Sequence, residues 1–294
     1  MIVHAVIAGA QKSGTTSLYR YLAQHPQLAT HGQTEMSYFV NEHEQRGGLA
    51  AAERKYFPDA GARRRLAKHV MLMGSEAGMA RFVAHNPEAR LIVVLREPVA
   101  RAYSAFWYAR LCGWEDAESF EEALGREPHR LAADGWEHWR RCAYVTNGRY
   151  AEALARIDRH FAPERTLVLF DEELRADPRG CVRRCCVHLG IEDLCATLDV
   201  SHMHNIAAQP RSVLLARALA MLFLSRGALR SALRRLIPNR AAYRLRHALL
   251  ALNERPLEVP PMAPATAARL CEEFRAGNAA LRARVGNLPE GWCA

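Results

Sequence analysis

The chain has 294 residues, of which 50% are hydrophobic, and this is enough to bury one large core. Its 40 Lys and Arg residues outnumber its 31 Asp and Glu residues and give a net charge of +9. The sequence contains no low-complexity tract and no internal repeat, so we do not expect a repeat protein. It also lacks an uninterrupted apolar run of the roughly twenty residues that a membrane-spanning helix needs, so we expect no transmembrane segment.

The first predicted strand is the apolar run 3–8, which begins so early that we expect no signal peptide and a cytoplasmic, bacterial-type enzyme. After it, Gly9 and Gly14 permit backbone angles that a side chain disfavours, and a predicted helix begins at Thr15. The free N–H groups of a helix N-terminus attract anions. This corner predicts a phosphate-binding loop, with contacts from Gln11, Lys12, Ser13, Gly14, Thr15, Thr16 and Ser17.

The position of the lysine distinguishes this loop from the loop that binds nucleoside triphosphates. In that motif a lysine follows the second glycine, whereas here Thr15 stands there and Lys12 lies inside the loop. A lysine in the loop is placed to contact the bridging oxygen of a 5′-linked leaving group. The chain has only three lysines, at positions 12, 55 and 68, so a chance lysine is a poor explanation, and an ordinary strand-turn-helix corner would not require one.

The second motif begins with a predicted strand over residues 91–95, which ends at Arg96. A helix with Pro98 in its first turn follows and carries Ser104. Ligands of parallel α/β sheets bind beyond the carboxyl ends of the strands, so we expect Arg96 and Ser104 to share one phosphate. A further predicted strand over residues 166–170 and the intervening helical stretches indicate a parallel sheet covered by helices.

Together the two motifs resemble the sulfotransferases that use 3′-phosphoadenosine 5′-phosphosulfate (PAPS), in particular the heparan-sulfate-type and related bacterial branch. The resemblance covers most of the chain and implies an α/β, P-loop-like three-layer fold with a central parallel sheet and a helical C-terminal region. We expect one sulfotransferase domain over residues 1–294, with a nucleotide-binding core over 1–200 and a basic lid region over 201–294. The resemblance also implies that the loop holds the 5′-phosphosulfate, that Arg96 and Ser104 hold the 3′-phosphate, and that adenosine 3′,5′-bisphosphate is the product.

The segment 33–39, Gln-Thr-Glu-Met-Ser-Tyr-Phe, is similar to the family's Lys-Glu-x-x-(Tyr/Phe)-Phe segment and places the catalytic carboxylate at Glu35. Sulfuryl transfer needs in-line positioning and charge stabilisation more than covalent catalysis. Glu35 would accept the proton of the acceptor hydroxyl, and Lys12 would neutralise the departing 5′-phosphate, without a metal. His31 and His43 remain alternative bases, although loop histidines are more often only exposed.

Two departures from the family lie on the acceptor side. Thr34 replaces the lysine that precedes the carboxylate, and the later Glu-Lys-Thr-Pro-like segment is replaced by residues 68–75. We therefore do not predict heparan as the acceptor, but a hydroxyl of a carbohydrate or a hydroxylated secondary metabolite, with an acidic or lipid-linked acceptor left open. His31, Trp114 and Trp136 are candidate acceptor contacts, although such aromatic residues more often pack in a core.

The stretch 210–253 contains nine arginines and no acidic residue, with leucines interleaved at helical spacing. A solvated helical face, a surface for anionic lipid and a lid over an acidic ligand all fit this pattern. The resemblance to related enzymes makes Arg211 and Ser212 candidates for a further phosphate contact. The eight cysteines form no Cys-x-x-Cys pair, so we expect reduced thiols, and Cys181, Cys185 and His188 lack an evident fourth ligand for zinc.

Two other functions compete with this prediction. A nucleotide kinase-like phosphotransferase would share the fold, but the displaced lysine and the lack of an evident strand-end aspartate beside Arg96 argue against it. A basic module that binds membrane surfaces or nucleic acid would explain the stretch 210–253 but not Lys12, Arg96 and Ser104. We expect a small-molecule or glycan acceptor and no nucleic-acid partner. Neither the acceptor's identity nor the oligomeric state follows from the motifs.

Overall fold

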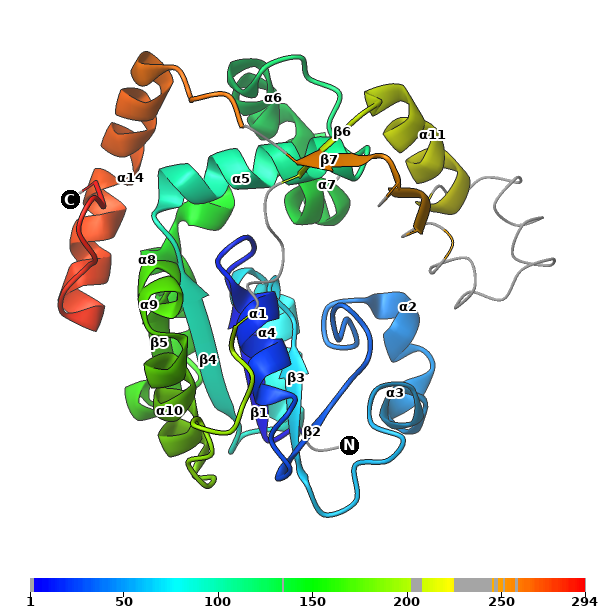
Figure 1. The fold of residues 1–294 in the computed structure, drawn as a ribbon, viewed down its shortest axis with the longest axis vertical. Coiled ribbons are helices and arrows are strands. Elements are labelled where there is room, and N and C mark those ends of the chain that lie inside the picture. Colours follow the sequence, from blue (N-terminus) through cyan, green and yellow to red (C-terminus); the bar gives the residue numbers. More distant parts are fainter. Residues whose placement is uncertain are drawn as a thin grey trace. The chain divides into compact units, whose positions relative to one another are not determined.

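The computed structural model describes residues 3–133, 135–201, 208–224, 245, 248–250, 252–256 and 259–293. The chain forms two compact units, each assembled from separate stretches (Figure 1). The first unit comprises Met1–Pro98, Arg149–Asn205 and Cys271–Ala294, and the second comprises Val99–Gly148 and Ile206–Leu270. The functional division at residue 200 stays a prediction.

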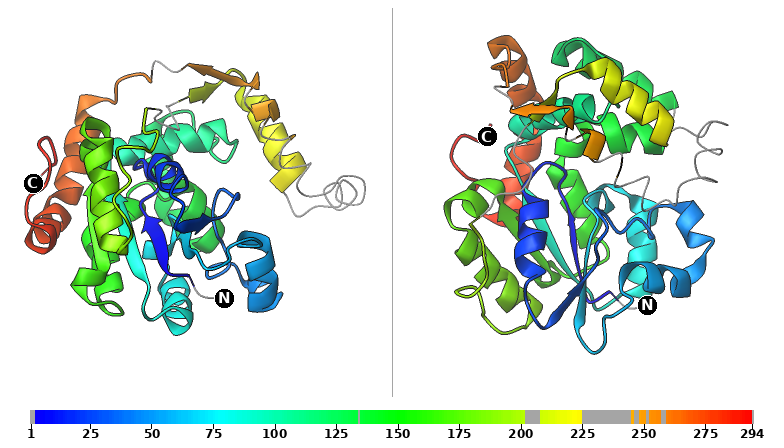
Figure 2. Two further views of the ribbon diagram at one scale, coloured as in Figure 1. Left: turned by 60° about the horizontal axis from the view of Figure 1, so that its bottom comes forward. Right: turned by 45° about the vertical axis from the view of Figure 1, so that its right-hand side comes forward.

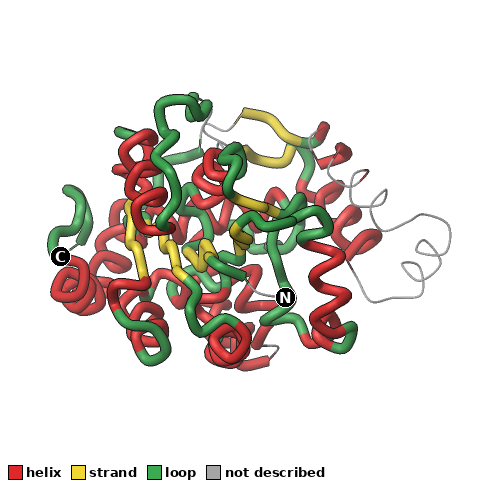
Figure 3. The backbone as a smooth tube through the Cα atoms, turned by 90° about the horizontal axis from the view of Figure 1, so that it is seen from below, coloured by secondary structure: helices red, strands yellow, loops and turns green. Residues whose placement is uncertain are grey.

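The parallel sheet that the sequence predicts forms the centre of the first unit, and it contains five strands, two more than the three predicted apolar runs. In spatial order its strands are β2 (Leu28–Thr30), β3 (Arg64–Lys68), β1 (Ala5–Gly9), β4 (Arg90–Leu95) and β5 (Thr166–Phe170). All of β1 and all but the first residue of β4 are buried, which is typical of parallel strands covered on both faces. In Figure 3 the yellow strands of this sheet run between red helices.

Helices flank this sheet, and α1 and α10 pack against one face of it (Figures 1 and 2). The helices contained in the first unit are α1 (Thr15–Leu22), α2 (Glu42–Gln45), α3 (Gly48–Tyr56), η1 (Leu72–Gly74), α4 (Glu76–His85), α8 (Tyr150–Asp158), η3 (Pro163–Arg165), α9 (Asp171–Ala176) and α10 (Pro178–Leu189). Leu18 and Leu22 of α1 meet Cys181 and Cys185 of α10 over buried strand residues such as Ile92. The apolar side chains of these two helices therefore form a hydrophobic core with one face of the sheet.

The cysteines of α10 contribute to packing. Cys185 is fully buried, and burial raises the pKa of Cys181 to about 11, so both thiols stay protonated at neutral pH. His188 lies within hydrogen-bond distance of the Leu91 carbonyl through Nε2 (3.0 Å). No group of three His, Cys, Asp or Glu side chains within the described ranges is arranged to hold a metal ion.

Helices dominate the second unit. Its elements are most of α5 (Pro98–Leu111), α6 (Phe120–Ala133), α7 (Gly135–Cys142), η2 (Thr146–Gly148), α11 (Val213–Leu224) and the antiparallel pair β6 (Ala208–Pro210) and β7 (Glu254–Pro256). The fully buried carboxylate of Glu115 organises α6, because it accepts hydrogen bonds from Arg130 (Nη2, 2.8 Å) and from the Tyr144 hydroxyl (2.6 Å). This buried charge is both paired and hydrogen-bonded, as its burial requires.

Helix α11 corrects the amphipathic pattern inferred from the sequence. The leucine spacing places Leu214 and Leu215 on the apolar face, but these side chains are 78% and 47% exposed. Leu219 and Phe223 are buried instead and pack with Leu250. Because α11 is apolar almost all round, its periodicity could not identify the buried face. Most of the basic stretch beyond α11, residues 225–244, lies outside the described residues, and no described helix is long and apolar enough to cross a bilayer.

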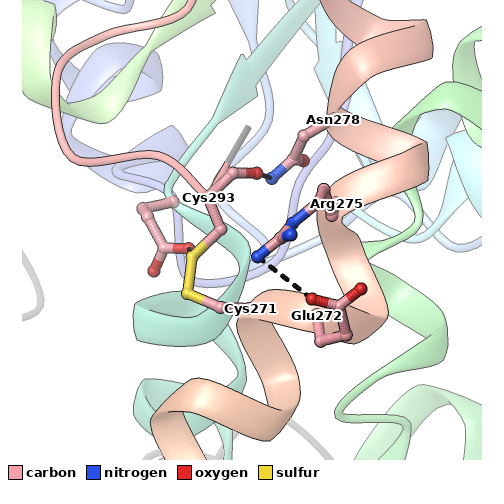
Figure 4. Close-up of a disulfide and its surroundings, with 6 residues drawn as sticks. Cys271, Glu272, Arg275, Asn278 and Cys293 are labelled. Carbon is pink, nitrogen blue, oxygen red and sulfur yellow. Dashed lines mark hydrogen bonds and ion pairs between the residues drawn. A yellow bond between two sulfur atoms is a disulfide. The ribbon is translucent and has the colours of Figure 1, made fainter.

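The C-terminal helix α14 (Pro264–Val285) and the segment after it correct the expectation of reduced thiols. Cys271 and Cys293 form a disulfide, with their Cα atoms 5.2 Å apart, and the Asn278 amide donates a hydrogen bond to the carbonyl of Cys293 (Figure 4). The chain turns back along α14 through Gly286 and Gly291, both with positive φ. Two cysteines separated by 22 residues therefore meet, which their spacing alone does not indicate.

Candidate active site

The predicted phosphate loop connects β1 to α1. Its backbone is left-handed at Lys12 (φ 68°) and at Gly14 (φ 76°), the residue that precedes α1. Among the described residues no side chain caps this helix end. The N–H groups of the first turn are therefore oriented for an anion at the point where the loop opens.

The seven predicted loop residues divide into two groups by exposure. Gln11, Lys12, Gly14 and Thr16 are partly exposed, whereas Ser13, Thr15 and Ser17 are buried. Ser17 donates its N–H to the Gly14 carbonyl (3.0 Å), and its hydroxyl is hydrogen-bonded to Tyr21, so both of its polar groups are engaged within the protein. Ser13 differs, because its fully buried hydroxyl has no hydrogen-bond partner among the described residues. A buried polar group of this kind is expected to have a partner, which a bound phosphate would supply.

The structure brings Arg96 to this loop. Arg96 follows β4, the neighbour of β1, and its Nη1 lies 3.4 Å from the Lys12 carbonyl oxygen. The hydroxyl of Tyr150 donates a hydrogen bond to the Arg96 carbonyl (2.8 Å), which fixes the main chain at the end of the strand. The guanidinium group is therefore held beside the loop while about a quarter of the side chain stays exposed.

The structure places a strand-end aspartate, Asp171, beside Arg96, and this is a correction, because no such aspartate was evident in the sequence. Asp171 follows β5, and its Oδ2 lies 3.7 Å from Arg96 Nε and 2.8 Å from Arg175 Nε. The side chain is almost completely buried. The signal was present in the sequence, since Asp171 follows an apolar strand in the same way that Arg96 does.

Glu35 lies near the end of β3 on the other side of β1. Its carboxylate forms an ion pair with the buried ammonium group of Lys68, the last residue of β3, and accepts a hydrogen bond from the Val70 N–H (2.9 Å). Burial raises the pKa of Glu35, and the attraction of Lys68 opposes part of that rise. A quarter of the Glu35 side chain remains exposed, so the carboxylate is both oriented and accessible.

Lys68 is a site residue that the sequence interpretation missed. It appeared only as the start of the segment that departs from the family, whereas the structure pairs it with Glu35 across 33 positions of the chain. Its position at the carboxyl end of the strand 64–68 was the available signal.

His31 is buried, contrary to the expectation of an exposed loop histidine. Its Nε2 accepts a hydrogen bond from the Lys68 N–H (3.1 Å), so its Nδ1 carries the proton and donates to the Gln33 carbonyl (3.0 Å). Burial lowers its pKa to about 4. Both ring nitrogens are engaged within the protein, which argues against His31 as base or acceptor contact. His43, in α2, is exposed.

The remaining predicted contacts belong to the second unit. Ser104 lies in α5 and is half-buried, while Trp114 is half-buried between the Tyr108 ring and the guanidinium groups of Arg140 and Arg141. The Ser212 hydroxyl accepts a hydrogen bond from the Leu215 N–H (3.2 Å) in the first turn of α11. Arg211 is exposed, and the side chain of Trp136 lies outside the described residues.

Within the first unit, residues from three adjacent strand ends thus form one edge: Glu35 with Lys68 at β3, Lys12 after β1, and Arg96 after β4. We call this group the carboxyl-edge site. It combines a carboxylate with a raised pKa, the uncapped end of α1 and three cations, of which Lys68 is paired with the carboxylate. Such a set can hold a phosphorylated donor and remove a proton from an acceptor.

Gly14→Ala tests how closely the loop is packed. A Cβ at this position would lie 2.7 Å from Asp171 Oδ1 and 3.0 Å from Leu174 Cδ2, and the left-handed backbone alone costs about 1–2 kcal/mol for a residue with a side chain. Urea denaturation should show a larger loss of unfolding free energy than Gly48→Ala, the matched control with φ +75° and open space around it. Equal losses in the two variants would contradict the close packing of loop and aspartate.

Lys68→Met tests the electrostatic control of Glu35. As a general base, Glu35 would have to be ionised, so kcat/KM should fall as pH falls through a pKa above the ordinary value of 4.5. Removing Lys68 removes the attraction that lowers this pKa, so the acid limb of the pH–rate profile should move to higher pH. Lys55→Met, which removes a lysine paired instead with Glu44, should leave the limb in place. An acid limb that stays fixed or moves to lower pH in Lys68→Met would contradict the assignment.

Comparison with known proteins identifies the family of the chain. The sulfotransferase domain family matches residues 3–216. Human bifunctional heparan sulfate N-deacetylase/N-sulfotransferase 3 is 27% identical over 197 residues, which cover 63% of this chain and 22% of that protein. Mouse heparan sulfate glucosamine 3-O-sulfotransferase 3B1 is 29% identical over 188 residues, covering 64% of this chain and 46% of that protein. The chain therefore spans less than half the length of these curated relatives.

A solved structure shows the same fold. The sulfotransferase from Alicyclobacillus acidocaldarius superposes with a TM-score of 0.68 at 22% identity, and the match covers 99% of this chain and 98% of that one. The predicted P-loop-like fold and the predicted family are confirmed. The family match covers well over half of the sequence, and the chain belongs to the sulfotransferase family.

Proposed function

We propose that this protein transfers a sulfuryl group from PAPS to a hydroxyl group of a carbohydrate or a hydroxylated natural product. The observation that carries the proposal is the carboxyl-edge site, where a loop with an internal lysine, a strand-end arginine and an accessible glutamate with a raised pKa lie on adjacent strands. Each group matches one need of an in-line transfer from a donor with two phosphate-bearing ends.

The residues of the loop fit the donor. The uncapped N-terminus of α1, the Lys12 ammonium and the buried Ser13 hydroxyl would bind the 5′-phosphosulfate, and Arg96 would bind the 3′-phosphate. Bound there, PAPS supplies an activated sulfuryl group and a phosphate leaving group. Lys12 would stabilise the negative charge that grows on the bridging oxygen as the bond to sulfur breaks.

Glu35 would act on the acceptor. Its carboxylate accepts the hydroxyl proton as the oxygen attacks sulfur, so the acceptor becomes a nucleophile without forming a free alkoxide. Lys68 and the Val70 N–H hold the carboxylate in one orientation, which lowers the cost of reaching the reactive geometry.

We choose the acceptor class from the number of positive charges near Glu35 that are available to bind an anionic glycan. The human and mouse relatives described above are named for heparan sulfate, a polyanion, but here Thr34 stands where the resemblance predicts a lysine, and Lys68 is paired with Glu35. Fewer cations are thus left to bind an anionic glycan near the base. We therefore favour a less charged hydroxyl acceptor.

Asp171 favours a second candidate, a nucleotide kinase-like phosphotransferase, because a strand-end aspartate can hold Mg²⁺ in such enzymes. The ion pairs of Asp171 with Arg96 and Arg175 weigh against this role, since a magnesium ion would compete with two guanidinium groups for a buried carboxylate. The sulfotransferase function requires no displacement of these pairs.

Transfer of labelled sulfate from PAPS to a panel of simple sugars, aliphatic alcohols and phenols tests the proposal. Wild-type protein should release adenosine 3′,5′-bisphosphate in step with a sulfated product, whereas Glu35→Gln should yield neither above background. Phosphate transfer from ATP with magnesium, without sulfate transfer to any acceptor, would support the phosphotransferase instead.

A further inference from the structure

Asp171 has no role in the sulfuryl transfer described above, yet it is buried beside the loop and beside Arg96. Its side chain is 2% exposed, and its Oδ1 has no hydrogen-bond partner among the described residues. Leaving one oxygen of a buried carboxylate unsatisfied costs free energy, so the position needs an explanation other than packing alone.

The surroundings of the two oxygens suggest that explanation. Oδ1 faces the loop, because a Cβ on Gly14 would lie only 2.7 Å from it. Oδ2 lies 2.8 Å from Arg175 Nε and 3.7 Å from Arg96 Nε. The carboxylate therefore lies between the loop that precedes α1 and the guanidinium group that follows β4.

The charges in this group leave Arg96 able to bind an anion. Arg175 is the nearer cation, and its hydrogen bond offsets the single negative charge of Asp171. Arg96 stands at ion-pair distance without a hydrogen bond to the carboxylate, and its Nη1 donates to the Lys12 carbonyl (3.4 Å). An arginine has five N–H donors, so donors remain for a phosphate.

We propose that Asp171 is a positioning residue, which holds the Arg96 guanidinium against the main chain of the phosphate loop and thereby directs it to the 3′-phosphate of the donor. This inference rests on the proposed function, in which Arg96 binds that phosphate. Asp171 itself touches no substrate. Arg175 neutralises the negative charge of Asp171. The positive charge of Arg96 is therefore not offset by Asp171 and can attract the phosphate.

The test compares the affinities of two ligands, adenosine 3′,5′-bisphosphate and adenosine 5′-phosphate, which differ only in the 3′-phosphate. Their affinity ratio, measured by calorimetry, reports the 3′-phosphate contact and is insensitive to a loss of folded protein. Arg96→Ala should lower the ratio by about 10- to 100-fold, the effect of a charge-assisted contact. Asp171→Asn should lower it by about tenfold.

A double-mutant cycle separates positioning from an independent effect. In the Arg96→Ala background, Asp171→Asn should change the ratio by less than about twofold, because the group that it positions is absent. Asp177→Ala serves as the control: it removes the cap of α10 that accepts the Gly180 N–H (2.8 Å), so it should lower stability without changing the ratio.

Arg175→Gln keeps the inference testable if Asp171→Asn fails to fold. The Arg175 side chain is 55% exposed, so its replacement is compatible with folding. Of the two arginines that contact Asp171, this variant leaves only Arg96. The carboxylate should then draw Arg96 toward itself and away from the 3′-phosphate, which should lower the affinity ratio several-fold.

The outcomes distinguish a failure of the proposed role of Arg96 from a failure of the proposed role of Asp171. An unchanged ratio in Arg96→Ala would overturn the assignment of Arg96 to the 3′-phosphate, and the inference with it. A lowered ratio in Arg96→Ala, together with an unchanged ratio in Asp171→Asn or, where that variant does not fold, in Arg175→Gln, would overturn the role of Asp171 and leave the proposed function intact.

Discussion

Glu35→Gln should lower kcat by about 10²- to 10⁴-fold, the contribution of a positioned general base, and leave the affinity for adenosine 3′,5′-bisphosphate within about twofold of wild type. The amide keeps the shape of the carboxylate but cannot accept the acceptor proton. Steady-state kinetics with PAPS and calorimetry with the bisphosphate measure the two effects separately. Glu42→Gln, which changes an exposed glutamate of α2, should leave both values unchanged.

The buried partner of Glu35 sharpens this prediction. Glu35→Gln leaves the Lys68 ammonium without its ion pair in a side chain only 3% exposed, so the variant should also lose stability. Combining it with Lys68→Met removes the buried charge and should restore stability without restoring turnover. Recovery of activity in the double variant would contradict the role of Glu35 as base and would attribute the loss to folding.

Lys12→Ala should lower kcat by about 10²- to 10³-fold, the loss typical of removing one preorganised group that stabilises transition-state charge. Binding of adenosine 3′,5′-bisphosphate should weaken less, by about tenfold, because the helix N-terminus still holds the 5′-phosphate. Single-turnover kinetics and calorimetry measure the two quantities.

Lys55→Ala is the matched control for Lys12. Lys55 is one of the other two lysines, and its ammonium pairs with Glu44 (2.8 Å) and contacts the Tyr56 hydroxyl (2.9 Å). Its removal should leave kcat near the wild-type value. Equal losses in the two variants, or an unchanged kcat in Lys12→Ala, would contradict the assignment of Lys12 to the leaving group.

The sequence predicted the parts of the site that follow β1 and β4, but it missed Lys68 at the end of β3 and Asp171 after β5. The apolar runs 3–8 and 91–95 become β1 and β4, and the parallel sheet places their ends side by side, so the loop and Arg96 lie on the same edge of the sheet. This works because burial on both faces of a parallel sheet leaves a continuous apolar run that a sequence reveals directly.

Contacts between distant parts of the chain could not be predicted in this way. The pairing of Glu35 with Lys68 depends on the path of the chain between β2 and β3, and the burial of His31 depends on a hydrogen bond from the Lys68 main chain. Likewise, Cys271 meets Cys293 only because the chain turns back after α14. Such contacts are fixed by tertiary packing rather than by local pattern.

Calorimetric titration of the metal-free protein with adenosine 3′,5′-bisphosphate, compared with a titration with ATP and magnesium, tests whether PAPS is the donor. We expect tight binding of the bisphosphate, weakened by both Lys12→Ala and Arg96→Ala, and much weaker binding of the triphosphate. Preference for ATP with magnesium, or no binding of the bisphosphate, would contradict PAPS as the donor.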